Sequence, residues 1–219
     1  TSADDLLHKS LLEKDILFKE LQHRTKNSLG LVSSLLSLSM SELQDELAAR
    51  KILEAVDRIR SIAVLYEKLS ASSSSGRIDL AAYIRDILTL LDATYASAQE
   101  RVQIVQRLEE IPCSLRWAVT IGLLLNELIT NAYKYAYPGE RRGEIRVDLH
   151  SEGEDAFLTV SDDGVGIPGP FDLKEAKTLG LRIIRLLAEE IGGSLSFDTH
   201  RGVTASIRFP LRIMTTSLS

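Results

Sequence analysis

Apolar residues recur every three or four positions along the first 70 residues, the spacing of one face of an α-helix. From residue 4 to residue 40 there is no proline and a single glycine, and the recurring positions are Leu7, Leu11, Leu17, Leu21, Val32, Leu35 and Leu36. Ser41 then resembles a helix N-cap, and a second stripe follows through Ile52, Val56, Ile59, Ala63 and Tyr66. The pattern predicts two long helices in an antiparallel hairpin.

The apolar stripe of this hairpin is too broad for a single partner helix to cover. A second copy of the chain would cover it in a four-helix bundle, an architecture in which two helical hairpins bury their apolar faces together. We therefore expect a homodimer, with residues 1–70 as an all-α dimerisation domain.

The stretch SASSSSGR at residues 70–77 is typical of a flexible linker. We place the linker at residues 71–77, a second domain at 78–211 and a tail at 212–219. In the second domain we predict helices at 80–98, 115–136 and 180–193, and strands at 102–106, 144–150, 156–162, 194–200 and 203–209. The helices do not alternate one for one with the strands, which favours an α+β sandwich with a mixed sheet and helices on one face.

Composition and charge narrow the possible functions. The net charge of −5 argues against a nucleic-acid partner, because nucleic-acid-binding domains usually carry a basic face. The single cysteine, Cys113, excludes an internal disulfide and a cysteine-rich metal site, and it is compatible with a reducing cytoplasm. No window approaches the run of about 18 apolar residues that spans a bilayer, and the amino end has no signal-peptide core.

Polar side chains share a face of the otherwise apolar helix LLLNELITNAYKYAYP, residues 123–138. Glu127, Asn131 and Lys134 are spaced i, i+4 and i+7, so they lie on one side of the helix. An amide oxygen can bind Mg²⁺ beside phosphate oxygens, and an ammonium group can meet phosphate charge. The face therefore suits a magnesium nucleotide, although the solvated face of a surface helix gives the same periodicity.

Two glycine motifs follow this helix. In VSDDGVGIPG the residues Asp162, Gly164 and Gly166 are spaced D-x-G-x-G at the end of a predicted strand. Glycines permit close approach of a ligand, and a carboxylate there can accept a hydrogen bond from an exocyclic amine such as that of adenine. In TLGLRII, Gly180 comes directly before a predicted helix, whose free N–H groups can hold phosphate. Each glycine motif alone is weak evidence, but the polar helix face followed by the two glycine motifs, in this order, is a specific pattern.

The segments NELITNAYKYA, DDGVGIP and TLGLRII resemble the N box and the two glycine boxes of the ATPase domain of sensor histidine kinases. This domain belongs to the wider superfamily with gyrase, the Hsp90 chaperones and MutL. The resemblance covers about residues 78–211 and ends on VTASIRFPL, which is similar to the last strand of the family. It implies a Bergerat-type ATP-binding fold.

The resemblance implies a role for each matching residue. Asn131 would be the Mg²⁺ ligand, Lys134 a phosphate contact and Asp162 the adenine anchor. Glu127 would orient the metal-bound water or assist proton removal. The other nucleotide contacts that it implies are Tyr135, Gly164, Gly166, Thr178, Gly180 and Leu181. Only 13 residues separate Gly166 from Gly180, so we expect a short ATP lid.

The segment ELQHRTKNSLGLVSSLLSL, residues 20–38, resembles the dimerisation and phosphotransfer helix of the HWE-related histidine kinases. That class has H-R-x-x-N where commoner kinases have H-E-x-x-N or H-E-x-x-T. His23 would be the phosphoacceptor, since a neutral imidazole is a competent nucleophile near neutral pH. Arg24 cannot take the imidazole proton, so Glu20 is the candidate base. Arg24 would steer the γ-phosphate or the acidic pocket of the regulator, and Asn27 would orient the water that dephosphorylates the regulator.

Together the resemblances imply an ATP- and Mg²⁺-dependent protein-histidine kinase of two-component signalling. Its phosphoryl group would pass from His23 to an aspartate in the receiver domain of a response regulator. We expect a cytoplasmic catalytic core with a sensory segment upstream of residue 1. Two alternatives remain: an ATP-driven clamp like gyrase or MutL, which gives His23 no role, and a non-catalytic phosphotransfer scaffold, which leaves Asn131, Lys134 and Asp162 without one.

Overall fold

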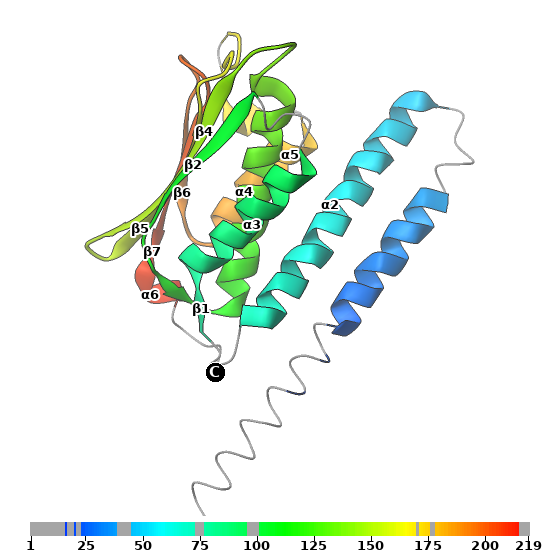
Figure 1. Ribbon diagram of the computed structural model, residues 1–219, viewed down its shortest axis with the longest axis horizontal. Coiled ribbons are helices and arrows are strands. Elements are labelled where there is room, and N and C mark those ends of the chain that lie inside the picture. The colour runs from blue at the N-terminus through cyan, green and yellow to red at the C-terminus, as the bar shows by residue number, and fades with distance from the viewer. Residues whose placement is uncertain are drawn as a thin grey trace, which may run out of the picture. The chain divides into compact units, whose positions relative to one another are not determined.

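The computed structural model describes most of the chain (Figure 1). The described residues are 16, 20, 23–38, 45–72, 77–95, 101–169, 171–175 and 178–214. The chain divides into two compact units, Thr1–Ser75 and Gly76–Ser219. The predicted N-cap Ser41 and the apolar positions Leu7, Leu11, Leu17 and Leu21 lie outside the described residues.

The described part of the first unit contains two helices that lie beside each other in Figure 1. Residues 23–38 are helical, and α2 spans Glu46–Ser72. Asp45 Oδ1 accepts a hydrogen bond from Ala48 N at 3.3 Å, which satisfies a free N–H group in the first turn of α2. Lys26 Nζ lies 2.6 Å from Glu67 Oε2, so residue 26 of the first helix lies beside the last turns of α2, as in an antiparallel hairpin.

The first helix carries an apolar row that the described part of the chain leaves exposed. Leu31, Val32, Leu35 and Leu38 are 62%, 45%, 54% and 67% exposed. Large aliphatic side chains seldom stay in contact with water in a contiguous row unless a partner covers them. α2 continues to Ser72, so the first two residues of the predicted linker are helical.

The second unit is built on a five-stranded mixed sheet of order β2-β4-β5-β7-β6. Its strands are β2 (Val102–Leu108), β4 (Gly143–Glu152), β5 (Asp155–Asp162), β6 (Ser194–Asp198) and β7 (Thr204–Pro210). β2 is parallel to β4, and the other neighbouring strands are antiparallel. Every second residue of β5 is buried, so one face of the sheet forms the core.

Three helices cover that face, which confirms the predicted α+β sandwich with helices on one side (Figure 1). They are α3 (Leu80–Thr94), α4 (Leu115–Asn131) and α5 (Leu179–Glu190). Asp79 caps α3, because its carboxylate oxygens accept from Ala81 N and Ala82 N at 3.0 and 3.2 Å. The largest fully buried side chains are Tyr83, Phe209, Ile78, Leu80, Ile84, Ile87, Ile121, Leu124, Leu125 and Ile129.

Four short elements were not predicted. Two-residue strands β1 (Ile78–Asp79) and β3 (Pro112–Cys113) pair with each other, η3 spans Leu173–Glu175, and α6 spans Leu211–Met214, across the predicted start of the tail. The predicted α-helix to residue 136 is wrong in its last turn, since α4 ends at Asn131 and a π-helical turn, η2, spans Ala132–Ala136. A π turn closes wider hydrogen-bonded rings than an α turn, and such turns are frequent at functional sites.

Cys113, the single cysteine of the chain, is buried. Burial raises the pKa of its thiol to about 12, so the thiol stays protonated and unreactive at neutral pH. Among the residues that the structure describes, no helix combines the length and apolar character needed to cross a membrane.

Candidate active site

Three segments of the second unit meet at the carboxyl end of β5. The first is η2, the second is the β5 loop, which we define as residues 163–167, and the third is the hairpin between β6 and β7. Val165 N donates to Ala136 O at 2.9 Å, which joins the β5 loop to the end of η2. Asp162 N donates to Val203 O at 2.9 Å, which joins the strand end to the hairpin. The predicted N box and first glycine box are therefore brought together.

Asp162 occupies the last inward position of β5, after the apolar Ala156, Leu158 and Val160. Its carboxylate is 9% exposed, and Oδ1 accepts from Gly164 N at 2.9 Å and from Val203 N at 3.2 Å. Burial raises the pKa of Asp162 above its ordinary value, although these two N–H groups oppose the shift. Within the described part of the chain only Oδ1 has hydrogen-bond partners, so Oδ2 is the oxygen available to a ligand.

Gly164 and Gly166 are required by close approach of neighbouring segments. A Cβ atom at Gly164 would lie 2.5 Å from Ala136 O and 2.7 Å from Ala136 Cα. Gly166 has φ +71°, and a Cβ atom there would lie 2.8 Å from Thr199 O. Any larger residue would push the β5 loop away from η2 or from the hairpin. The predicted glycine motif thus has a steric reason at both positions.

The predicted N-box residues lie on α4 and η2. Asn131 is the last residue of α4 and is half-buried, and Glu127, one turn earlier, is 5% exposed. Lys134 and Tyr135 are exposed on η2. Because η2 is a π turn, these two residues follow Asn131 in a wider turn than the predicted α-helical one.

The third motif forms the start of α5. Thr178 is the N-cap residue, with extended backbone and no side-chain capping bond. The sequence predicted Gly180 directly before the helix. The helix begins at Leu179, so Gly180 lies in its first turn instead. Gly180 is buried and Leu181 half-buried. The N–H groups of this first turn have no partner within the helix and can receive an anion.

The segment between Gly166 and Gly180 contains the short helix η3 and an aromatic contact. The Phe171 and Phe197 rings lie 5.3 Å apart between centroids, with 57° between their planes. Phe197 belongs to β6, so this contact fixes the middle of the predicted ATP lid against the sheet.

His23, Glu20, Arg24 and Asn27 lie together on the first helix, and all four are exposed or half-buried. Asn27 Nδ2 lies 3.3 Å from His23 Nδ1, with donor and acceptor roles set by the tautomer. Glu20 Oε1 accepts from Arg24 Nε at 3.0 Å and from Arg24 Nη2 at 2.7 Å. The amide of Asn27 therefore contacts the imidazole, whereas the predicted base, Glu20, pairs with Arg24.

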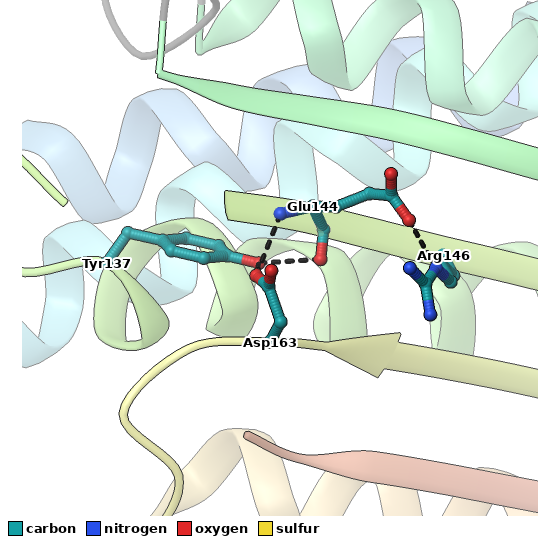
Figure 2. Close-up of polar contacts among 4 residues, drawn as sticks. All are labelled: Tyr137, Glu144, Arg146 and Asp163. Carbon is teal, nitrogen blue, oxygen red and sulfur yellow. Dashed lines mark hydrogen bonds and ion pairs between the residues drawn. The ribbon is translucent and has the colours of Figure 1, made fainter. Parts of the chain in front are cut away.

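The sequence did not single out Tyr137 and Asp163. The Tyr137 hydroxyl lies 3.0 Å from Asp163 Oδ1, and Glu144 N donates to the same oxygen at 2.8 Å (Figure 2). The available signal was the doubled aspartate in DDG, because consecutive strand residues point to opposite faces and two carboxylates there cannot share one task.

The described residues contain no group of three or more His, Cys, Asp and Glu side chains arranged to hold a metal ion. A Mg²⁺ ion at Asn131 would therefore take most of its oxygen ligands from phosphate and water, which is how this ion usually binds in nucleotide sites. The donor set of the N box fits a metal that arrives with a nucleotide.

Two family models match the chain. One is described as histidine kinase and matches residues 20–95, and the other is described as histidine kinase-, DNA gyrase B-, and HSP90-like ATPase and matches residues 118–213. The sensor histidine kinase PdtaS of Mycobacterium tuberculosis is 29% identical over 208 residues, covering 93% of this chain and 41% of that protein. Blue-light-activated histidine kinase 2 of Erythrobacter litoralis is 29% identical over 201 residues, covering 89% of this chain and 56% of that protein.

The fold is similar to that of a solved histidine kinase domain. The structure is that of the histidine kinase domain of a blue-light-activated histidine kinase from Erythrobacter litoralis, with a TM-score of 0.67 and 25% identity. The match covers 93% of this chain and 97% of that domain. The chain spans about half the length of the curated relatives it matches.

Proposed function

Because this chain belongs to the sensor histidine kinases, we propose that it uses ATP to phosphorylate His23 and then passes the phosphoryl group to an aspartate of a response regulator. One observation carries the proposal: the buried Asp162, whose Oδ2 has no hydrogen-bond partner among the described residues, lies beside the N box, in the same chain as an exposed imidazole on an H-R-x-x-N helix. Neither a clamp ATPase nor a scaffold uses both features.

In this proposal Asp162 contacts the adenine of the nucleotide, and the N box contacts its metal-bound phosphates. Asp162 Oδ2 would accept a hydrogen bond from the exocyclic amine of adenine, because its other oxygen is held by Gly164 N and Val203 N. Asn131 would hold Mg²⁺, and the exposed Lys134 would contact phosphate. When bound, Mg²⁺ would neutralise charge on the phosphate oxygens. A core that uses ATP would lie in the cytoplasm, where ATP is available.

His23 would attack through the nitrogen that faces away from Asn27. Nδ1 contacts the Asn27 amide, so Nε2 is the nitrogen that can reach the γ-phosphorus. With the amide turned so that its oxygen accepts from Nδ1–H, Nε2 keeps the lone pair that the attack needs. An N–P bond forms as the bond between the γ-phosphorus and the β,γ-bridging oxygen breaks, ADP leaves, and the imidazole proton passes to a base.

Glu20 is the base that we propose, and its replacement tests that role. Glu20 Oε1 is engaged with Arg24, so the Nδ1 proton, once its hydrogen bond to Asn27 opens, would pass to Oε2. Glu20→Gln keeps an acceptor for Arg24 but removes the base, and should slow phosphorylation of His23 roughly 10²-fold, the usual scale for a positioned base. The measurement is single-turnover labelling with γ-labelled ATP, together with ATP affinity, which should not change.

Glu67→Gln is the matched control, because Glu67 is an exposed hairpin glutamate that pairs with Lys26. It should phosphorylate at the rate of the unchanged protein. An unchanged rate in Glu20→Gln would assign the proton to Glu127 or to solvent.

The response regulator would bind the exposed surface around His23. Its receiver-domain carboxylate would form a P–O bond as the N–P bond of phosphohistidine breaks, and His23 would take back one proton to become a neutral imidazole. Arg24, whose side chain is 76% exposed, would face the acidic pocket of the regulator, and Asn27 would orient the water of the reverse, phosphatase reaction. These roles share one helical turn on either side of His23.

The exposed apolar row of the first helix supports a homodimer. A second copy of the hairpin would cover Leu31, Val32, Leu35 and Leu38 in a four-helix bundle. We expect light scattering to give twice the chain mass at micromolar concentration. Leu35→Glu combined with Leu38→Glu should give the mass of one chain, since two carboxylates would be buried in the bundle. If the unchanged protein scattered light with the mass of one chain, the proposed four-helix bundle would be wrong.

The overall test is incubation with γ-labelled ATP followed by acid and alkali treatment of the protein. The expected product is labelled protein that loses its phosphate in acid and keeps it in alkali, as phosphohistidine does. Release of labelled phosphate without labelled protein would indicate a clamp ATPase in place of a kinase. Failure to bind ATP at all would indicate a phosphotransfer scaffold.

A further inference from the structure

Tyr137 and Asp163 tie the end of η2 to the β5 loop through shared hydrogen bonds (Figure 2). The Tyr137 hydroxyl lies 2.7 Å from Glu144 O and 3.0 Å from Asp163 Oδ1, and can donate its one proton to either. Asp163 Oδ1 also accepts from Glu144 N at 2.8 Å. The Glu144 carboxylate itself turns to Arg146, so only the backbone of Glu144 joins the cluster.

Asp162 and Asp163 hold the same turn from opposite sides. Asp162 accepts hydrogen bonds from Gly164 N and Val203 N, whereas Asp163 accepts them from the Tyr137 hydroxyl and from Glu144 N. The slight burial of Asp163 would raise its pKa, but the hydrogen bonds from Glu144 and Tyr137 outweigh burial and keep the pKa below its ordinary value. The same hydrogen bonds thus favour the ionised carboxylate, which only accepts hydrogen bonds.

The backbone of the β5 loop is held by the same stretch of chain. Arg141 Nη2 donates to Asp163 O at 2.8 Å and to Gly164 O at 3.2 Å. Val165 N donates to Ala136 O at 2.9 Å. All of these partners come from residues 136–144, the segment that continues directly from the N box. The loop and the N box therefore move as one body.

We propose that Tyr137 and Asp163 are positioning residues of the nucleotide site, which fix the distance between Asp162 and Asn131. The inference rests on the proposed function, because ATP is the ligand whose adenine would meet Asp162 while its metal-bound phosphates meet Asn131. One ligand that bridges two anchors binds tightly only when the anchors are already at the right separation. The hydrogen bond between the Tyr137 hydroxyl and Asp163 Oδ1 holds Asp162 and Asn131 at that separation before ATP binds.

The test is the affinity for Mg·ATP, measured by calorimetry on the whole chain. Asp163→Ala should weaken binding about tenfold, since two hydrogen bonds to one oxygen are lost. Tyr137→Phe should weaken it about threefold, because Glu144 N still holds Asp163. Asp163→Asn should bind as the unchanged protein does, because its amide oxygen accepts the same two hydrogens.

Asp155→Ala is the matched control. Asp155 begins the same strand and accepts from Arg208 Nε and Nη2 at 2.8 and 2.5 Å, at the end of β5 far from the loop. Its loss should leave the affinity unchanged. The double variant Tyr137→Phe with Asp163→Ala should weaken binding by less than the product of the two single effects, since both changes remove the hydrogen bond between Tyr137 and Asp163.

Several results would overturn the inference. Wild-type affinity in both Asp163→Ala and Tyr137→Phe would show that the separation is set elsewhere, and Tyr137→Phe decides this point if Asp163→Ala does not fold. Equal weakening by Asp163→Asn and Asp163→Ala would show that the charge of Asp163 matters and its position does not. No binding by the unchanged protein would overturn the proposed function, and the inference with it.

Discussion

Replacing His23 with glutamine is expected to abolish transfer of labelled phosphate from ATP to the protein. The glutamine amide nitrogen has no free lone pair and cannot attack phosphorus, whereas a neutral imidazole nitrogen can. Affinity for ATP should stay unchanged, because Asp162 and Asn131 belong to the second unit and His23 to the first. The measurement is protein-bound label after gel separation, alongside ATP binding to the same sample.

His150→Gln provides the control for this experiment. His150 is an exposed histidine of the second unit, stacked on Phe157 with ring centroids 5.2 Å apart and paired with Asp148. Its replacement should leave labelling intact. Persistent acid-labile phosphate in His23→Gln would remove His23 as the acceptor and would leave the kinase assignment to another histidine.

Replacing Asp162 with asparagine is expected to lower ATP affinity about 10³-fold, because an amide N–H group would face the exocyclic amine where an acceptor is needed. The same change should make the ligand-free protein more stable to heat at neutral pH. The asparagine oxygen can still accept from Gly164 N and Val203 N, and the cost of burying a charge disappears. Gain of stability with loss of binding is the signature of a functional buried charge.

The pH dependence of this stabilisation has a definite sign. Burial raises the pKa of Asp162 in the folded state above 3.8, so in the interval between 3.8 and the raised pKa the folded protein binds more protons than the unfolded one. Stability from this group therefore falls as pH rises through that interval and reaches its minimum above it. Melting temperatures at pH 7 should favour Asp162→Asn, and the difference should shrink as the pH approaches 3.8. Unchanged ATP affinity in this variant would remove Asp162 from the site.

Much of the second unit could be predicted from periodicity. β5 alternates half-buried and buried residues along its whole length, and every second residue of β4 from Ile145 to Leu149 is buried, so the predicted sandwich follows from that alternation. β1 and β3 were not predicted, because a strand of two residues is too short to show a periodic pattern. The π turn η2 was not predicted for a different reason. The helical propensity of Ala132–Ala136 does not distinguish an α turn from a π turn. The contact of this turn with the β5 loop involves residues distant in the sequence.

The site was predictable where it depends on local chemistry. Gly164 and Gly166 show in the sequence as turn residues beside a carboxylate, and the structure adds the neighbours that exclude a side chain. Tyr137 and Asp163 are 26 residues apart, so their contact follows only from the pairing of segments in three dimensions. For Glu20 the sequence offers two neighbours on one helical face, His23 and Arg24, and spacing alone cannot choose between them.

The buried thiol of Cys113 makes the natural chain almost inert to maleimide reagents, because a thiol with a pKa of about 12 holds hardly any thiolate at pH 7. The protein thus needs no cysteine removal before site-specific labelling. Cysteines introduced at exposed Asp57 on α2 and at exposed Gln103 on β2 could carry a donor and an acceptor fluorophore. Energy transfer between them would report, in real time, whether the distance between the two units changes during the proposed phosphoryl transfer.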